Sequence, residues 1–408
     1  MGGIAMSLFA STTNGERYGV LIEIGSGSAS VAIVSSKPHS DSPDIIWSKR
    51  ETAALRNVDN LKESSKSVLT ALINILLDFE TNGQLALSQH APKARITTMQ
   101  CTVAAPWSYT VTKKIHYESD HTFTVGQELL DKLAKKATTQ TEEALAESKV
   151  VTDLGLETAS KATMHTFLNG YSVQTPLGKE AKKISLVHTS MMVHSYILDT
   201  LRDLQKKMFK SAVLEVYTYA SVFSCVVRDV IPKHKNVALI DVTYEATEIS
   251  VLREGVLSYV THTPFGLYSL ARELSAITGD PLTESLRHLY SENIEEYVST
   301  FKKEKQREIE QLFSSYIARL QELLLETGDE LAAPRQMLIH SAKNTGSLIS
   351  EFITMASKQA LKMSPVITDV NEALSSFSAE ELVAKRDQSL LISAFFYHTG
   401  NHCFTIEH

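Results

Sequence analysis

A short run of small residues near the N-terminus could bind a phosphate group. Gly25, Ser26, Gly27 and Ser28 follow an apolar segment and precede a β-branched one. Backbone N–H groups in such a turn can donate to phosphate oxygens, and the small side chains let a phosphate approach closely. No Lys-Ser or Lys-Thr follows, as a Walker A loop requires, and a strand follows where a dinucleotide fold has a helix. The alternative is an ordinary hairpin turn.

Two acidic residues lie near the ends of apolar strands in the two halves of the chain. Glu23 closes the first of these strands and Asp241 the second. Carboxylates at such positions can hold a magnesium ion through water, because Mg²⁺ prefers hard oxygen ligands and keeps several waters. We therefore predict that Glu23 and Asp241 position magnesium. The alternative for each is an acid that faces solvent or caps a turn.

Other kinds of chemistry find no support in the sequence. The Gly-x-Ser-x-Gly pattern of a nucleophile elbow is absent, and no His/Cys spacing matches a known metal site. The net charge is -7, and no array of aromatic and basic residues is present, so we expect no nucleic-acid partner. No catalytic residue is predicted.

Two α/β units are needed to position these candidates. A strand–turn–strand pattern surrounds Gly25 and recurs around Asp241, which suggests an internal duplication. Apolar residues at helical spacing predict an amphipathic helix over residues 61–79, between the first two buried strands. The spacing also predicts helices over 195–208, 267–277, a charged stretch at 292–326, 347–361 and 389–397.

The overall composition is that of a globular protein with two or more domains. The chain has 408 residues, of which 43% are hydrophobic and 21% charged. Cys101, Cys225 and Cys403 are odd in number and far apart, which argues against a disulfide framework and favours a reducing compartment. No stretch approaches the roughly 18 to 20 apolar residues that span a bilayer. Residues 1–17 lack the pattern of a signal peptide, so we expect a flexible N-terminus on a cytoplasmic protein.

Several segments, in order, resemble motifs of the actin-like ATPase superfamily. Asn236–Gly266 resembles its second phosphate-binding hairpin, in the form found in the FtsA/PilM branch. Ile22–Ser28 is similar to the first phosphate loop, and Met337–Gly346 stands where the adenosine motif is expected. Phe167–Val193 resembles the subdomain (SHS2) that is inserted in FtsA and PilM. The resemblance extends from about residue 18 to 397.

This resemblance implies a fold, a division into domains and a nucleotide site. The implied fold class is α/β: a duplicated, RNase H-like pair of lobes with a small inserted α+β subdomain. The implied parts are a flexible segment at 1–17, a first lobe at 18–111 completed by 370–408, an inserted subdomain at 112–210, and a second lobe at 211–369 with a helical part near 280–330. The implied cofactors are ATP and magnesium. Implied nucleotide-binding residues are Gly25, Ser26, Gly27, Ser28, Asp241, Thr243, Thr247 and Gly346.

The chain departs from the family pattern at the nucleotide motifs. The aspartate of the first loop is Glu23, and the glycines of the second loop are replaced by Thr243, Tyr244 and Glu245. A carboxylate beside phosphates is repulsive unless a metal bridges them. These motifs are therefore degenerate, and we expect ATP hydrolysis to be weakened or lost.

The resemblance implies a cytoplasmic scaffold that organises a membrane-associated machine of cell division or type IV pilus assembly. Its partners would be proteins at the inner membrane, which would hold it there without direct insertion, and it could also self-associate or form filaments. The alternative is an active ATPase or small-molecule kinase of the same superfamily. A kinase needs a base for the acceptor hydroxyl, and no residue stands out for that role.

Overall fold

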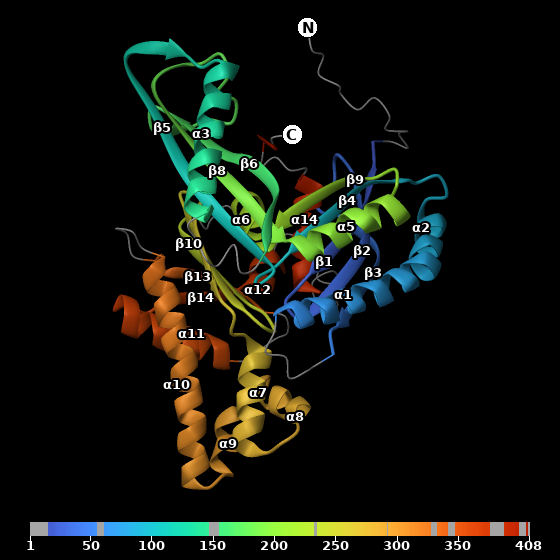
Figure 1. The fold of residues 1–408 in the computed structure, drawn as a ribbon, viewed down its shortest axis with the longest axis vertical. Coiled ribbons are helices and arrows are strands. Elements are labelled where there is room, and N and C mark those ends of the chain that lie inside the picture. Colours follow the sequence, from blue (N-terminus) through green and yellow to red (C-terminus); the bar gives the residue numbers. More distant parts are fainter. Residues whose placement is uncertain are drawn as a thin grey trace.

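The computed structural model describes residues 15–54, 61–146, 155–231, 235–291, 293–327, 333–341, 347–375, 387–399 and 405–406. Gly346 and the tail residues His402, Cys403 and His408 lie outside these ranges. Three sheets carry the fold: one in each of two lobes, and an antiparallel sheet in a subdomain that projects from them (Figure 1).

The first sheet has the strand order β3-β2-β1-β4-β9. Its central strands are nearly continuous apolar runs that are buried on both faces, as predicted. Helices α1 and α5 pack on one face, and α14 packs on the other. The elements are β1 (Arg17–Ile24), β2 (Ser28–Ser36), β3 (Asp44–Thr52), β4 (Ile96–Val103), β9 (Val213–Thr218), α1 (Leu61–Asp78), the short helices η1 (Phe79–Gly83) and α2 (Gln84–His90), α5 (Ser195–Met208) and α14 (Gln388–Thr399).

The second sheet repeats this pairing pattern in the order β12-β11-β10-β13-β14. In both sheets the central strand pairs antiparallel with the next strand and parallel with a later one. Glu254 and Gly255 join β11 to β12 with φ angles of 54° and 78°, which is the conformation of the predicted two-residue hairpin turn. The strands are β10 (Val237–Val242), β11 (Thr247–Arg253), β12 (Val256–Thr263), β13 (Gln336–Ser341) and β14 (Val366–Asp369).

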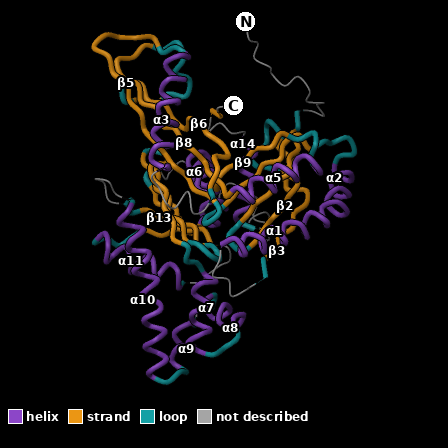
Figure 2. Tube along the Cα trace, viewed as in Figure 1, coloured by secondary structure: helices purple, strands orange, loops and turns teal. Residues whose placement is uncertain are grey.

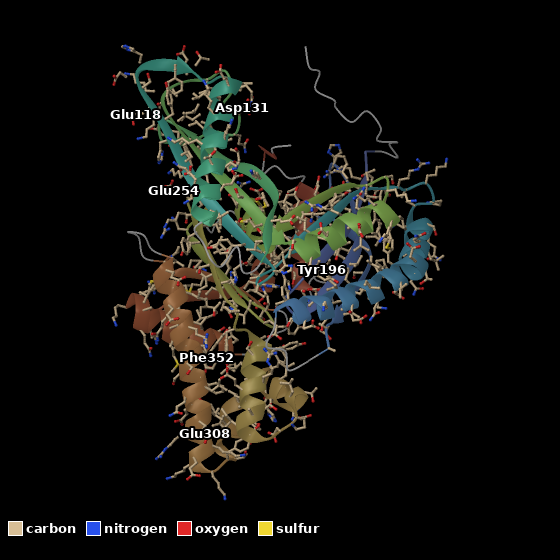
Figure 3. The ribbon with its side chains drawn as sticks, in the orientation of Figure 1. Glu118, Asp131, Tyr196, Glu254, Glu308 and Phe352 are labelled. Carbon is tan, nitrogen blue, oxygen red and sulfur yellow. The ribbon has the colours of Figure 1, made fainter. Side chains whose placement is uncertain are left out.

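Helices complete the second lobe and connect it to the first. Helix α6 carries nine consecutive buried residues, and its core includes side chains from β10, β11, β12 and α14. Helices α7 to α10 form a projecting helical part, with Glu308 near its far end (Figure 3). The helices are α6 (Tyr219–Val230), α7 (Leu267–Thr278), α8 (Leu282–Leu289), α9 (Ile294–Ser299), α10 (Lys303–Glu326), α11 (Leu348–Leu361) and α12 (Val370–Ser375).

The third sheet belongs to the inserted subdomain, whose order is β15-β6-β8-β5 with β7 paired to β6. Helix α3 covers one face of this sheet over a small apolar core (Figure 2). Glu118 and Asp131 lie toward its outer end (Figure 3). The elements are β5 (Ser108–Thr124), α3 (Gln127–Ala146), β6 (Leu156–Leu168), β7 (Tyr171–Ser172), β8 (Glu180–His194) and β15 (Thr405–Ile406). The predicted α/β fold of two RNase H-like lobes with an insertion is confirmed.

Some local expectations were wrong. The charged stretch at 292–326 forms two helices, because the chain turns at residues 300–302 between α9 and α10. Strand β9 pairs with β4 in the first sheet, although the predicted boundary at residue 211 assigned it to the second lobe. Cys225 is disulfide-bonded, whereas the number and spacing of the cysteines argued against a disulfide framework. In the part of the chain that the structure describes, no helix has the length and apolar character needed to cross a bilayer.

Candidate functional site: the cleft between two loops

The two predicted phosphate loops are the same kind of turn at equivalent places in the two lobes. The N–H of Gly25 donates to the carbonyl of Ser28 at 2.9 Å, directly after β1. The N–H of Thr243 donates to the carbonyl of Ala246, also at 2.9 Å, directly after β10. We call residues 25–28 the first loop and residues 243–246 the second loop.

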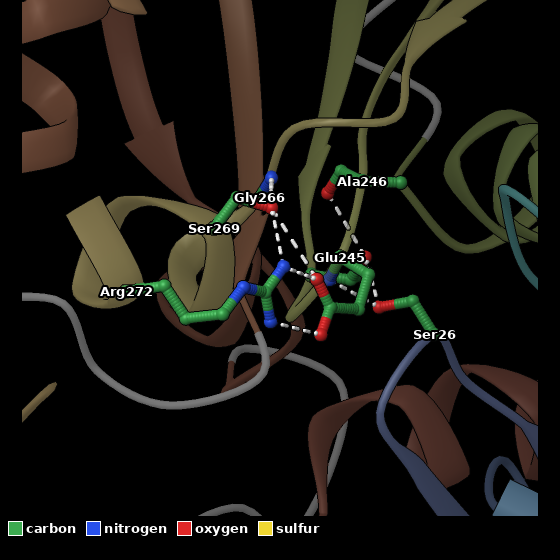
Figure 4. Close-up of polar contacts among 7 residues, drawn as sticks. Ser26, Glu245, Ala246, Gly266, Ser269 and Arg272 are labelled. Carbon is green, nitrogen blue, oxygen red and sulfur yellow. Dashed lines mark hydrogen bonds and ion pairs between the residues drawn. The ribbon is translucent and has the colours of Figure 1, made fainter. Parts of the chain in front are cut away.

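The two loops bind each other directly. The hydroxyl of Ser26 donates to Oγ1 of Thr243 at 2.8 Å and accepts the backbone N–H of Glu245 at 2.8 Å. Figure 4 shows Ser26 reaching Glu245 from the opposite side of the cleft. A Cβ atom on Gly27 would lie 2.6 Å from Cβ of Tyr244, so this tyrosine packs against the bare backbone of the first loop. The structure thus brings the predicted residues of both loops together.

The bulky residues of the second loop are anchored to their own lobe by α7. The ring of Tyr244 lies 4.3 Å from that of Tyr268. Arg272 binds the carboxylate of Glu245 through two nitrogens, at 2.8 and 2.6 Å, and the hydroxyl of Ser269 adds a third contact at 3.3 Å (Figure 4). The side chains that replace the family's glycines are therefore fixed parts of the fold.

Thr247 is not brought to this cleft. The Thr247 hydroxyl contacts the carbonyl of Phe265 and the hydroxyl of Tyr316, each at 2.9 Å, in the core of the second lobe. Gly346 lies outside the described residues. The nucleotide-binding roles proposed for these two residues stay predictions.

An ion pair that the sequence did not reveal borders the cleft. Arg50 on β3 lies 2.5 Å from the carboxylate of Asp387 and donates to the hydroxyl of Ser28 at 2.8 Å. Ser30 donates to the other oxygen of Asp387 at 2.6 Å. Asp387 is 357 residues from Ser30, so no sequence spacing could have pointed to it.

The space left between these side chains is small. It measures about 20 Å³, which is room for one or two water molecules. Its lining residues come from both lobes: Glu23, Gly25, Ser26, Ser28, Ser30, Arg50, Ala104, Tyr219, Asp241, Thr243, Tyr244, His340 and Ser389.

The two predicted magnesium-positioning acids are both buried, in different surroundings. Burial raises the pKa of Glu23 well above its usual value, and the Asp387 carboxylate adds to this effect. Oε1 of Glu23 has no hydrogen-bond partner within the described residues. Asp241 instead contacts Nδ1 of His340 at 2.6 Å through one carboxylate oxygen.

This arrangement does not fit a magnesium nucleotide. The raised pKa of Glu23 disfavours the charged form that a cation needs, and His340 already holds one oxygen of Asp241. No group of three or more His, Cys, Asp or Glu side chains in the described ranges could hold a metal ion. The water-mediated magnesium role of both acids stays a prediction, which nucleotide titration can test.

Comparison with known proteins identifies the fold. No protein-family model matches the sequence, and no curated protein matches it significantly. The structure is similar to PilM in the PilM–PilN type IV pilus biogenesis complex, with a TM-score of 0.54, 11% identity, and coverage of 93% of this chain and 97% of that one. The chain has the actin-like ATPase fold, as the sequence resemblance predicted.

Two further solved structures are more distant. EutJ from Carboxydothermus hydrogenoformans has a TM-score of 0.40 at 11% identity, covering 92% of this chain and 89% of that one. Lmo2764 from Listeria monocytogenes, a putative N-acetylmannosamine kinase by its own description, has a TM-score of 0.42 at 10% identity, covering 94% and 98%. At these scores neither likeness adds to the assignment.

Proposed function

We propose that this protein is an actin-like scaffold with weakened or lost ATP hydrolysis, which organises a membrane-associated machine through protein partners. The fold is similar to that of PilM, which was solved in complex with PilN, so type IV pilus assembly is the first candidate machine. Cell division is the second, through the FtsA resemblance of the sequence. The observation that carries the proposal is the direct contact between the two loops.

The loop contact uses groups that would otherwise face a nucleotide. In the family to which the sequence is similar, the phosphates lie between the two loops. Here the hydroxyl of Ser26 takes up the N–H of Glu245, and Tyr244 fills the space beside Gly27. A triphosphate is several times larger than the water-sized space that remains. Nucleotide binding would require the contact between the loops to break, and the free energy of this contact would weaken the affinity for nucleotide.

The same contacts join the lobes without a ligand. Ser26 belongs to the first lobe and Thr243 to the second, and the bond between them is buried. A closed arrangement of the lobes is then a property of the chain itself. A scaffold needs this constancy, because its partners must meet the same surface whatever the nucleotide supply.

Titration calorimetry with ATP and magnesium, with ADP alongside, tests the nucleotide part. We expect no heat of binding at millimolar nucleotide. Ser26→Ala is an informative variant, because it removes both bonds across the cleft and leaves the fold of each loop intact. Magnesium-dependent binding of ATP by the unaltered protein in the low micromolar range, followed by turnover, would show that the cleft is a working ATPase site.

The scaffold part is tested separately, with the cytoplasmic segment of the PilN-type partner from the same organism. We expect saturable binding of this segment, and none of a scrambled control. Binding of a division-type partner in its place would favour the second machine, and failure of both would contradict the scaffold role even if no nucleotide binds. Sedimentation at several concentrations tests self-association.

The proposed location is the cytoplasmic side of the inner membrane, reached through partners. The disulfide at Cys225 is unusual there, because cytosolic thiols are kept reduced. Cell fractionation with thiol trapping is therefore the measurement to make. Recovery of the protein from the periplasm would contradict the proposed location.

A further inference from the structure

Three residues from three elements form a hydrogen-bonded chain in the cleft. Asp241 on β10 contacts Nδ1 of His340 on β13 through Oδ1, at 2.6 Å. The other ring nitrogen, Nε2, lies 3.2 Å from the hydroxyl of Ser389, in the first turn of α14. Asp241 and His340 are cross-strand neighbours in the second sheet, so the fold fixes their approach.

The order of these bonds determines the direction of proton transfer. When Nδ1 of a neutral imidazole donates to a carboxylate, Nε2 is left as an acceptor. The hydroxyl of Ser389 then donates to Nε2 of His340. This is the arrangement in which a histidine removes a proton from a serine while an acid orients the ring. We propose that Ser389 is an activated nucleophile that accepts the acyl group of small uncharged esters, with His340 as general base and Asp241 as the orienting acid.

Packing around His340 holds this hydrogen-bonded chain of residues in place. The imidazole of His340 is held by two aromatic rings, with centroids 5.3 Å away for Tyr219 and 6.2 Å away for Phe223. His340 is 2% exposed, and Ser389 is 8% exposed. A buried hydrogen bond to a charged group is stronger than the same bond in water. The ring is therefore fixed by packing as well as by bonding.

Groups that could stabilise an oxyanion lie next to the nucleophile. The first hydrogen bond of α14 runs from the N–H of Leu391 to the carbonyl of Asp387. The N–H groups of Ser389 and Leu390 precede it and have no acceptor among the helix residues that the structure describes. Such N–H groups at a helix start are the donors that stabilise the charged oxygen of an acyl-transfer intermediate.

The cavity determines the class of substrate. All three residues of the hydrogen-bonded chain line the space of about 20 Å³, beside the small residues Gly25 and Ala104. Asp241 lines this space, and Arg50, which also lines it, is already paired with Asp387, so a negatively charged substrate is disfavoured. The smallest acyl group, acetyl, is therefore the best candidate, and even this group needs the loop contact at Ser26 to open before it can enter.

The reaction balances without any further reagent. Ser389 Oγ attacks the ester carbonyl, and its proton moves to Nε2 of His340. The C–O bond to the leaving group breaks, and that proton passes to the departing alkoxide. Water then attacks the acyl-serine, gives its proton to His340, and releases the carboxylic acid while the proton returns to Ser389.

A fluorophosphonate probe and p-nitrophenyl acetate together test the proposal. The probe forms a phosphorus–oxygen bond with an activated serine and releases fluoride. We expect one phosphonyl group per chain, mapped by mass spectrometry to Ser389, and hydrolysis of the acetate ester above background. Ser389→Ala should abolish both, and His340→Gln should slow labelling by 100-fold or more.

Matched controls separate this role from a structural one. Ser393 lies one turn further along α14 and is also buried, so Ser393→Ala should label at the rate of the unaltered protein. Thermal unfolding of each variant shows whether it folds. Failure of both reagents to modify Ser389 in the folded, unaltered protein would overturn the proposal, as would labelling that persists at full rate in His340→Gln.

Discussion

The two loops of the cleft share one backbone geometry and differ in what their side chains do. Each closes with an N–H to carbonyl bond of 2.9 Å after the central strand of its sheet. The first loop consists of glycines and serines, and its backbone is bare at Gly27. The second carries Tyr244 and Glu245, which are tied to α7. The two loops thus share one backbone geometry, and only the second carries bulky side chains.

Because of this difference, a direct contact between the two loops occupies the space between them. The second loop contributes the side chain of Tyr244, which packs against the bare backbone of the first loop at Gly27. The contact needs both, because a side chain on Gly27 would collide with Tyr244. The predictions below test this pair of loops and the groups around it, from the largest expected effect to the smallest.

Replacing Tyr244 by alanine should have the largest effect. The side chain is 2% exposed and packs on both Gly27 and Tyr268, so its removal leaves a cavity between the lobes. We expect a loss of about 3 to 4 kcal/mol in the free energy of unfolding, from urea denaturation. Tyr171→Ala is the matched control, because Tyr171 is 78% exposed and should change stability by less than about 0.5 kcal/mol. Equal effects in the two variants would contradict the packing role.

The acids beneath the loops should make stability depend on pH. Glu248 lies opposite Asp241 in the second sheet, and burial, reinforced by the Asp241 carboxylate, raises its pKa to about 8. A group whose pKa is raised on folding contributes its full stabilisation at pH values below its pKa in the unfolded chain, which is near 4.5. This contribution is lost as the pH rises through 8. Between pH 5 and pH 8, the free energy of unfolding of the unaltered protein should therefore fall by on the order of 3 kcal/mol more than that of Glu248→Gln.

The comparison with Glu248→Gln removes an opposing effect from the same sheet. His262 lies opposite Glu248, and burial lowers its pKa to about 4, so its contribution to stability is lost as the pH falls from 6.5 toward 4. Because both proteins carry His262, it cancels in the difference between their curves. Parallel curves for the two proteins from pH 5 to pH 8 would show that Glu248 titrates normally.

The sequence predicted the loops well and the contacts around them poorly. The turns at Gly25 and Thr243, and the acids that precede them, follow from local patterns: apolar strands, small residues and a repeated order. The sequence did not point to Arg50, His340 or Asp387, because each of them contacts a partner that lies far away in the chain. Only the folded sheets bring these groups within reach.

The sequence also could not predict the directions in which some side chains point. Thr247 begins β11, and the register of that strand turns its hydroxyl toward Tyr316 in the core. Successive residues of a strand point to opposite faces, so a one-residue difference decides whether a side chain faces the cleft. The family pattern gives the position of such a residue but not its partners.

Adding a methyl group to the first loop should have an intermediate effect that depends on the second. Gly27→Ala places a Cβ atom 2.6 Å from that of Tyr244, and we expect a loss of about 2 kcal/mol. In a Tyr244→Gly background the same change should cost less than about 0.5 kcal/mol, because the colliding Cβ and the ring are both absent. Gly126→Ala is the control, since a Cβ there meets no atom within 4 Å. Additive effects of the Gly27 and Tyr244 changes would contradict direct packing between the loops.

The ion pair that anchors the second loop should contribute least. Arg272 and Glu245 are about one fifth exposed and bind through two parallel hydrogen bonds, so a double-mutant cycle to alanine should give a coupling of about 1 kcal/mol. Lys132 and Glu128 form the control pair: both are largely exposed on α3, and their coupling should be smaller and should vanish in high salt. The Arg272–Glu245 coupling should largely survive the same salt, because solvent screens it less. If salt removes both couplings alike, then Glu245 is held in place by the backbone bond to Ser26 and by the turn itself, and not by α7.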